Sequence, residues 1–141
     1  MSTIGFDTSN YTTSTAWTDG KTDINVRQIL YVKDGERGIR QSDGVFQHMK
    51  LMPVMYENLS EQIDFKDVKA VGVSTRPRCV EGSYMPVFLA GEGYAKVVAN
   101  TLGVPLYEFS HQDGHIMAGI YSSGSFELLE KDFISVHLSG G

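Results

Sequence analysis

The chain has 141 residues, of which 41% are hydrophobic and 21% are charged, a composition typical of one globular domain. Its formal net charge of −5 argues against binding of nucleic acid through the overall field of the protein, although it leaves room for a local basic patch. The single cysteine, Cys79, cannot form an internal disulfide, and neither a signal peptide nor an apolar run of about 20 residues is found. We therefore expect a cytoplasmic protein that does not enter a membrane.

The first half of the chain predicts a group of strands followed by a helix. Three antiparallel strands are expected at Thr3–Thr8, in the Thr-rich segment that ends at Trp17, and at Ile24–Val32. Ser42 is expected to cap a helix in which Pro53 introduces a kink. The hydrophobic positions of that helix recur every three or four residues, at Val45, Met49, Met52, Tyr56, Leu59 and Ile63.

In the second half, strands and helices are expected to alternate. The predicted elements are a buried strand at Val68–Ser74, a helix at Tyr84–Leu102 that Gly103 ends, a strand at Val104–Phe109, a helix from His111 to about Tyr121, and a last strand at Phe133–Leu138. Gly91, Ala95 and Ala99 form a stripe of small residues that lets another element approach closely. The general rules of chain topology require only a mixed α/β fold, and this order is the pattern of a ribonuclease-H-like domain.

Two histidines at the start of the third helix are the strongest candidates for a functional site. Ser110 and Asp113 have the spacing of a capping box, so His111 and His115 follow on one face of the first turns. Both imidazoles can reach one cation there, and the helix dipole disfavours their protonated forms. Two ligands make half a metal site, and a third must come from elsewhere. The alternative is a pair of histidines that bond to the backbone.

The other histidines and the end of the chain carry weaker signals. We expect His48 on the surface of its helix, and His137 as a structural residue that alternates with the hydrophobic positions of the last strand. That strand runs into Ser139, Gly140 and Gly141, which resemble the entry to a phosphate-binding loop, where bare backbone N–H groups approach an anion. A frayed terminus that happens to hold glycines is the alternative.

Taken in order, the segments resemble the Gcp/TsaD family of actin-like (ASKHA) ATPases, formerly called O-sialoglycoprotein endopeptidases. The resemblance rests on the segments Ile4–Ser9, Gln41–His48, Val71–Arg78, Ser110–His115 and Ser139–Gly141. It implies an actin-like, ribonuclease-H-like domain at 1–125 and the first strand of a truncated second domain at 126–141. Because the second domain would complete the site, the chain by itself is expected to be inactive.

The activity that the resemblance implies is transfer of a threonylcarbamoyl group to N6 of an adenosine beside the tRNA anticodon. Its cofactors would be a divalent metal, iron or zinc, and ATP or an adenylate in the full-length protein. Its partners would be tRNA, through a full complex, and a protein partner or a second copy that binds the N-terminal domain. The implied metal ligands are His111 and His115, and the residues implied to face the phosphates are Asp7, Thr8, Ser9, Ser139, Gly140 and Gly141.

Departures from the family pattern leave other functions open. Asn10-Tyr11-Thr12 stands where the family has Cys-Asp-Glu, and Arg76-Pro77-Arg78 stands where it has Gly-Pro-Gly. The two arginines either hold an anion or are solvated loop charges. A non-catalytic paralogue or scaffold is therefore one alternative. A metallopeptidase is another, but Gln112 occupies the position at which zinc proteases place a general-base glutamate.

Overall fold

A five-stranded sheet forms the centre of the molecule. The structure is a computed structural model that describes residues 1–138. The strands are β1 (Ser2–Asp7), β2 (Thr12–Thr18), β3 (Asp23–Ile29), β4 (Val68–Arg76) and β5 (Leu106–Ser110), in the spatial order β3-β2-β1-β4-β5. The first three are antiparallel neighbours, whereas β4 is parallel to β1 and β5 is parallel to β4. The predicted α/β fold, with three antiparallel strands before the alternating elements, is confirmed.

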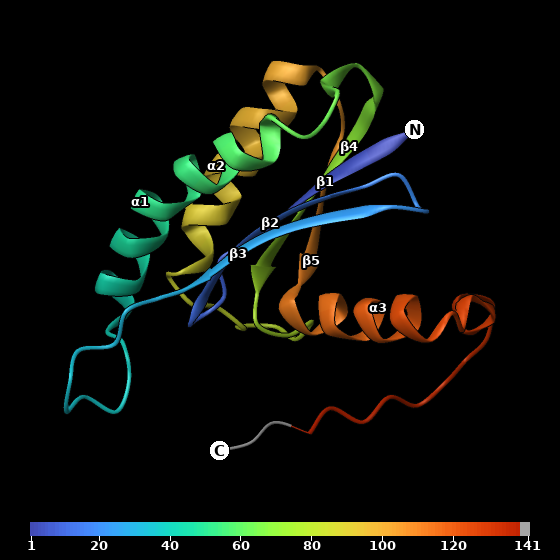
Figure 1. Cartoon of the computed structure of the whole chain (residues 1–141). Coiled ribbons are helices and arrows are strands. Elements are labelled where there is room, and N and C mark those ends of the chain that lie inside the picture. The colour runs from blue at the N-terminus through green and yellow to red at the C-terminus, as the bar shows by residue number, and fades with distance from the viewer. Residues whose placement is uncertain (139–141) are drawn as a thin grey trace.

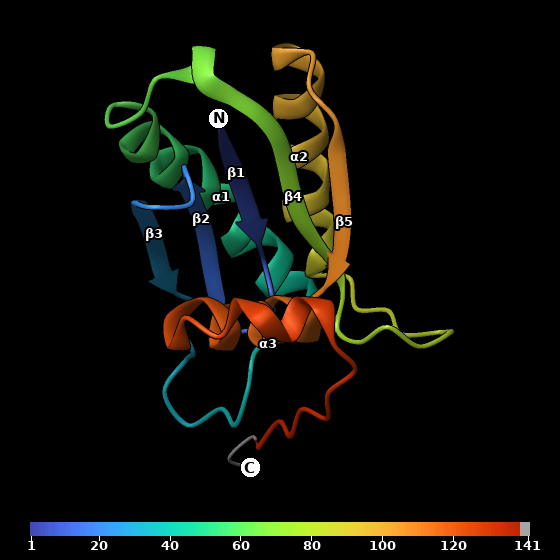
Figure 2. The same ribbon diagram turned by 90° about the vertical axis from the view of Figure 1, so that its right-hand side faces the viewer.

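Within residues 1–138, three α-helices accompany this sheet. α1 (Gln41–Ser60) and α2 (Phe88–Leu102) lie side by side along one face, and α3 (His111–Ser123) leaves the end of β5 on the other side (Figures 1 and 2). Short 3-10 turns, η1 (Phe65–Asp67) and η2 (Phe126–Glu130), precede β4 and follow α3. No helix within residues 1–138 is long and apolar enough to cross a bilayer.

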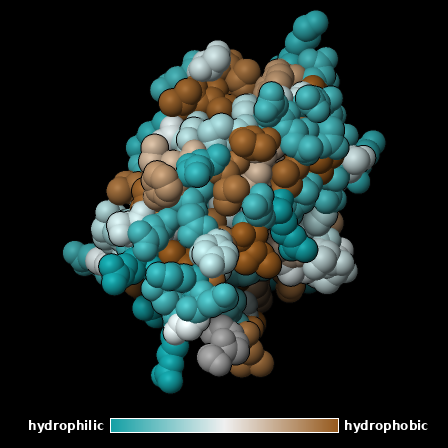
Figure 3. Space-filling view, turned by 60° about the vertical axis from the view of Figure 1, so that its left-hand side comes forward, coloured by the Kyte–Doolittle hydropathy of each residue, from teal (hydrophilic) through white to brown (hydrophobic). Residues whose placement is uncertain are grey.

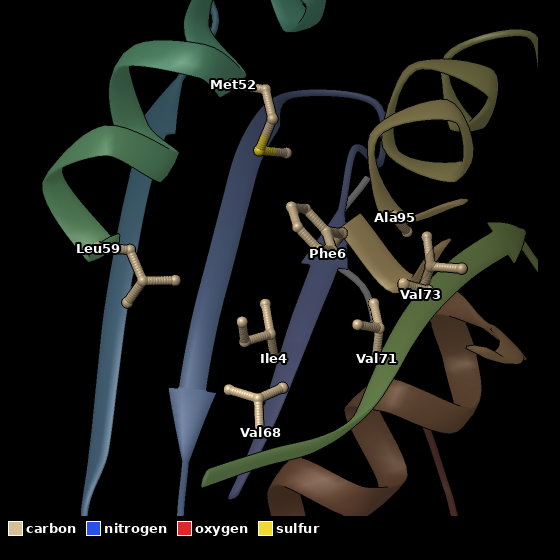
Figure 4. Packing of buried hydrophobic residues seen from close by; sticks show 9 residues of the cluster. Ile4, Phe6, Met52, Leu59, Val68, Val71, Val73 and Ala95 are labelled. Carbon is tan, nitrogen blue, oxygen red and sulfur yellow. The ribbon is translucent and has the colours of Figure 1, made fainter. Parts of the chain in front are cut away.

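The hydrophobic core lies between the sheet and the two helices α1 and α2. Alternate residues of β1 and β4 point into it, as strand geometry requires, and both helices contribute residues from one face (Figure 4). The core residues are Ile4, Phe6, Met52, Leu59, Val68, Val71, Val73, Ala95 and Ala99. Full burial of each large side chain contributes about 1.5–3 kcal/mol, so this layer supplies most of the apolar stabilisation.

The buried face of α1 differs from the predicted one. Arg40, not Ser42, is the N-cap and makes no side-chain cap hydrogen bond, and α1 runs without interruption through Pro53. The residues that α1 buries are Gly44, His48, Met52, Met55 and Leu59, while Met49 is exposed. A Cβ at Gly44 would lie 2.8 Å from the Val87 side chain, so the start of α1 closely approaches the segment before α2. That approach turns His48 inward, and its predicted place on the helix surface is wrong.

α2 begins later than predicted and ends where predicted. It starts at Phe88, because Pro86 disfavours the helical conformation of Met85 before it. Gly103, with φ 65°, takes the left-handed conformation that ends the helix. The small residues of α2 are buried, and a Cβ at Gly91 would lie 2.8 Å from the hydroxyl oxygen of Thr8. The stripe therefore packs α2 against the end of β1, within the domain.

The last predicted strand is wrong. Residues 131–138 contain neither helix nor strand, and within this segment the side chains of Ile134 and Leu138 are 95% and 91% exposed. A strand needs a hydrogen-bonded neighbour, and none of the five described strands pairs with this segment. Whether 126–141 opens a second domain stays a prediction, and Ser139, Gly140 and Gly141 lie outside the described residues.

The side of the molecule that carries α1 has a mixed surface. Phe46, Met49 and Val54 are exposed hydrophobic residues of this helix. Figure 3 brings the left-hand side of Figure 1 forward and shows hydrophobic groups separated by hydrophilic ones. Scattered apolar residues of this kind are normal on a protein surface, and they do not by themselves indicate a binding site.

Candidate metal centre

Three parallel strands bring distant residues together at one edge of the sheet. β1 ends at Asp7, β4 ends at Arg76 and β5 ends at Ser110, directly before His111. Because these strands are parallel, their carboxyl ends meet at the same edge, which is where open α/β sheets bind ligands. Asp7 and His111 thus come into contact although 104 residues separate them in the sequence.

The Asp7 carboxylate connects the end of β1 to the start of α3. Its Oδ2 lies 2.8 Å from Nδ1 of His111, and its Oδ1 accepts the backbone N–H of Ser9 at 2.8 Å. About a quarter of the Asp7 side chain and a third of the His111 side chain are exposed, 26% and 32%. Asp7 therefore holds the loop that follows β1 and orients the His111 ring at the same time.

The two candidate ligands face each other at the first turn of α3. Nε2 of His111 and Nε2 of His115 lie 2.8 Å apart, and the ring centroids are 4.3 Å apart at 76°. The predicted capping box is confirmed: the Ser110 hydroxyl accepts the Asp113 N–H at 3.1 Å, and the Asp113 carboxylate accepts the Ser110 N–H at 2.9 Å. The Asp113 carboxylate is thus engaged in the helix cap, so the two imidazoles are the groups of this turn that could bind a cation.

The electrostatics of the two histidines differ. Burial alone would raise the pKa of Asp7, but hydrogen bonds from His111 and Ser74 and the charge of His111 outweigh it, so this pKa is lowered. The hydrogen bond from Asp7 raises the pKa of His111 against the effect of burial. Burial, and then the charges of His111 and His137, lower the pKa of His115. The expectation that both rings are kept neutral therefore holds in direction for His115, through burial and neighbouring charges, but not for His111, because the hydrogen bond from Asp7 raises its pKa.

The donor set fits a transition metal. Histidine ligands typically donate their second ring N–H to a carboxylate, which leaves the other nitrogen free to coordinate. Asp7 has this relation to Nδ1 of His111, and Nε2 of that ring faces Nε2 of His115. Imidazole nitrogens suit zinc and iron. Within residues 1–138 no three donor side chains are already grouped to hold an ion, so the described geometry supplies two ligands.

Thr8, predicted to face a phosphate, has its side chain elsewhere. The side chain is fully buried, its hydroxyl donates to the Val87 carbonyl at 2.8 Å, and the same oxygen accepts the Gly91 N–H at 2.9 Å. These bonds fasten β1 to the start of α2. Contact of Thr8 with a ligand is therefore confined to its backbone, while Ser9 is partly exposed in the turn that Asp7 closes.

The arginine-bearing loop lies beside the first turn of α3. The Pro77 carbonyl accepts the backbone N–H of Gln112 at 3.1 Å, which places this loop next to the histidines. Nη1 of Arg76 donates to the Thr75 hydroxyl at 3.1 Å, and neither Arg76 nor Arg78 forms an ion pair with a carboxylate in the described part of the chain. The loop that carries both arginines therefore touches α3 at its first turn, and Nη2 of Arg76 lies 3.9 Å from Sγ of Cys79 within the same loop.

Sequence reasoning missed the environments of two further histidines. His48 is fully buried, with Nδ1 2.7 Å from the Thr13 hydroxyl, and no partner for its Nε2 is found in residues 1–138. Burial lowers the pKa of His48. His137 is not part of a strand, and its ring centroid lies 5.0 Å from that of His115. The spacing of His48 from Gly44 and Met52 would have indicated its buried face, whereas no pattern indicated the neighbour of His137.

Comparisons with known proteins relate the chain to one group of enzymes. No protein-family model matches the chain. It is 32% identical over 92 residues to the tRNA N6-adenosine threonylcarbamoyltransferase of Christiangramia forsetii, which is 64% of this chain and 26% of that protein. The enzymes of the same name from Pyrobaculum calidifontis and Clostridium kluyveri are 28% identical over 128 residues and 33% identical over 96 residues. Those matches cover 89% and 67% of this chain and 36% and 26% of the relatives.

Two solved structures share the fold. YeaZ from Pseudomonas aeruginosa has a TM-score of 0.54 at 16% identity, over 78% of this chain and 43% of that one. An uncharacterized protein from the same organism, with similarity to peptidase YEAZ, has a TM-score of 0.56 at 14% identity, over 77% and 43% of the two chains. The chain thus matches about a quarter to a third of the length of its curated relatives. It is a homologue of the tRNA N6-adenosine threonylcarbamoyltransferases over part of its length, with the actin-like fold of YeaZ, which confirms the Gcp/TsaD resemblance.

Proposed function

We propose that this chain is the metal-binding part of a protein that transfers a threonylcarbamoyl group to N6 of adenosine in tRNA. The observation that carries the proposal is the arrangement of Asp7, His111 and His115, in which a carboxylate orients one imidazole and the second imidazole faces it at 2.8 Å. The homology to transferases of that name supports the reaction. Because those matches cover 26% of each relative, the activity is proposed for the whole protein to which this region belongs.

Each residue of the candidate metal centre would have a separate role. Nε2 of His111 and Nε2 of His115 would hold an iron or zinc ion, and Asp7 would keep the His111 ring in the coordinating orientation. The ion, when bound, supplies a positive charge that polarises a phosphate or carbonyl oxygen. The capping box at Ser110 holds the first turn of α3, and therefore both rings, at the end of β5.

An adenylate or ATP would approach the same edge of the sheet. Its phosphates would face the backbone around Thr8 and Ser9, while the predicted phosphate contacts at Ser139, Gly140 and Gly141 lie outside the described residues. Arg76 and Arg78 would add guanidinium donors to a phosphate or carboxylate; this role is supported by the contact of their loop with Gln112 at the start of α3. In this assignment the side chains of the Arg76-Pro77-Arg78 loop bind the anion, whereas a Gly-Pro-Gly loop would offer only its backbone N–H groups.

Metal titration tests the first step of the proposal. Zn²⁺ is titrated calorimetrically into the protein and into its His111→Ala, His115→Ala and Gln112→Ala variants, of which the last changes the neighbouring side chain and leaves both rings. We expect stoichiometric binding that each histidine substitution abolishes and Gln112→Ala preserves. Binding that His111→Ala leaves unchanged would contradict the ligand assignment.

A non-catalytic paralogue or scaffold is the second candidate. It is favoured by the fold match to YeaZ, whose name differs from that of the transferases, and by the replacement of the acidic opening loop with Asn10-Tyr11-Thr12. A threonylcarbamoylation assay on tRNA with the complete protein, combined with size-exclusion and light scattering, separates the two. A protein that forms a stable complex with a bona fide transferase and transfers nothing supports the scaffold.

Metallopeptidase activity is the least supported function. The residue after the first histidine is Gln112, which cannot act as a general base. The Asp113 carboxylate is engaged by the N–H of Ser110 at 2.9 Å and closes the helix cap. Peptide cleavage that a chelator abolishes and added metal restores would reverse this order of candidates.

A further inference from the structure

The segment after α3 carries a third imidazole to the two candidate ligands. Figure 1 shows this segment turning at the end of α3 and running back below the helix. A shallow hollow between them is lined on the helix side by His115, Ile116 and Ile120 and on the other side by residues 133–137. The return path brings His137 to the first turn of α3, and its ring centroid lies 5.0 Å from that of His115, tilted by 52°.

The ring separation is the one that ligands of a common ion have. Two imidazoles bound at about 2.0–2.1 Å to a tetrahedral ion have donor nitrogens roughly 3.3 Å apart and ring centroids roughly 5 Å apart. The His115 and His137 centroids match that spacing at 5.0 Å. The His111 and His115 nitrogens, 2.8 Å apart, need to separate by about half an ångström to admit the ion. The His115 ring thus has two imidazole neighbours, with the centroid of His111 at 4.3 Å and that of His137 at 5.0 Å.

Packing does not explain the place of His137. Its neighbours Ile134 and Val136 are 95% and 77% exposed, so the segment is not a strand that buries one face. A structural role in a strand, as the sequence indicated, therefore does not apply. The observation that remains is a ring contact with a candidate ligand 22 residues earlier in the chain.

We propose that His137 is a third protein ligand of the metal site that His111 and His115 begin. The inference rests on the metal site of the proposed function and adds a ligand from the described chain. Since three donors are not yet grouped in residues 1–138, His137 and the segment that carries it close onto the ion when it binds. Three imidazoles leave the fourth position of a tetrahedral ion open, as catalytic sites require.

Cobalt titration followed by visible absorption tests this ligand. Co²⁺ is titrated into the whole chain as wild type and as His137→Gln, His111→Gln and Val136→Ala variants, with Zn²⁺ competition to obtain affinities. Loss of an outer-shell partner alone typically lowers affinity 10- to 100-fold, so we expect His137→Gln to lower it by at least about 100-fold and to change the absorption bands. Val136→Ala alters the adjacent exposed side chain and should leave both unchanged.

The outcomes distinguish a failure of the His137 ligand from a failure of the metal site formed by His111 and His115. If His111→Gln abolishes binding while His137→Gln retains wild-type affinity and spectrum, the two-histidine site stands and the third ligand is wrong. If His111→Gln also binds like the wild type, the metal site itself is wrong and the inference falls with it. As a second readout, the ring nitrogen resonances of His137 should shift on addition of Zn²⁺, and unchanged resonances would overturn the proposal. Circular dichroism of each variant verifies the fold.

Discussion

The two sides of the sheet are held by different forces. α1 and α2 bury Met52, Leu59, Ala95 and Ala99 against β1 and β4, whereas the one buried residue of α3 among those described is Ile120. α3 is fastened instead at its start, by the capping box and by the Asp7–His111 contact. The first side owes its stability to non-directional apolar burial, and the second depends on a few directional polar contacts.

That difference places the candidate site in the less stable part of the molecule. Elements with few buried apolar contacts open at a lower free energy than the core, and ligand-binding elements are drawn from this part of a structure. A bound ion would add ligand bonds where burial is poor. The metal would therefore stabilise the start of α3 more than it stabilises the α1 and α2 layer.

The largest expected effect is a loss of stability in the core. Leu59→Ala removes a fully buried side chain of α1 and should lower the free energy of unfolding by about 2–5 kcal/mol. Met117→Ala on α3 truncates a side chain that is 42% exposed and should cost less than about 1 kcal/mol. Urea unfolding of both variants measures the contrast, and equal losses would show that α3 is packed as firmly as α1.

The next effect concerns the polar fastening of α3. Asp7→Asn retains the size of the side chain but removes the charge that orients His111, so Zn²⁺ affinity should fall about 10- to 100-fold. Asp43→Asn, an exposed carboxylate on α1, is the matched control and should leave the affinity unchanged. Calorimetric titration gives both values. An unaltered affinity for Asp7→Asn would separate Asp7 from the site.

A smaller change is expected where α2 approaches β1. The new methyl group of Gly91→Ala would meet the Thr8 hydroxyl oxygen at 2.8 Å, and that oxygen is fixed by two hydrogen bonds. We expect a loss of about 1–3 kcal/mol from overpacking. Gly93→Ala, two residues on in the same helix, meets no atom within 4 Å and should gain up to about 1 kcal/mol. A stabilising Gly91→Ala in urea unfolding would mean that Thr8 can move aside.

The last prediction concerns the pH dependence of the unfolding free energy, through the buried His48 of α1. The pKa of His48 is lowered in the folded protein by burial, so the unfolded chain takes up the proton more readily. Stability should therefore fall as pH decreases from the ordinary histidine pKa of 6.5 toward the lower folded value. His48→Asn keeps a hydrogen-bonding amide near the position of Nδ1, which faces Thr13, and cannot titrate, so the unfolding free energy of this variant should fall less between pH 7.5 and 5.5. Parallel pH profiles would show that His48 is not the responsible group.

Local signals in the sequence predicted most of the elements and one part of the site. The capping box of Ser110 and Asp113 and the spacing of His111 and His115 depend only on residues within one helical turn, and the structure confirms the cap. Gly103 ends α2 for an equally local reason, its left-handed φ of 65°. These features could be predicted because the interacting groups are neighbours in the chain.

The environments of the remaining site residues depended on the tertiary structure. The side chain of Thr8, a candidate phosphate contact, is buried and hydrogen-bonded to the Val87 carbonyl before α2. Asp7 contacts His111 because β4 pairs in parallel with both β1 and β5, which aligns the ends of those two strands. Local sequence indicates which groups can coordinate a cation and where each helix can begin or end, since backbone geometry acts over a few residues. It does not indicate which of these groups meet, because contacts between distant segments follow from the packing of the whole sheet.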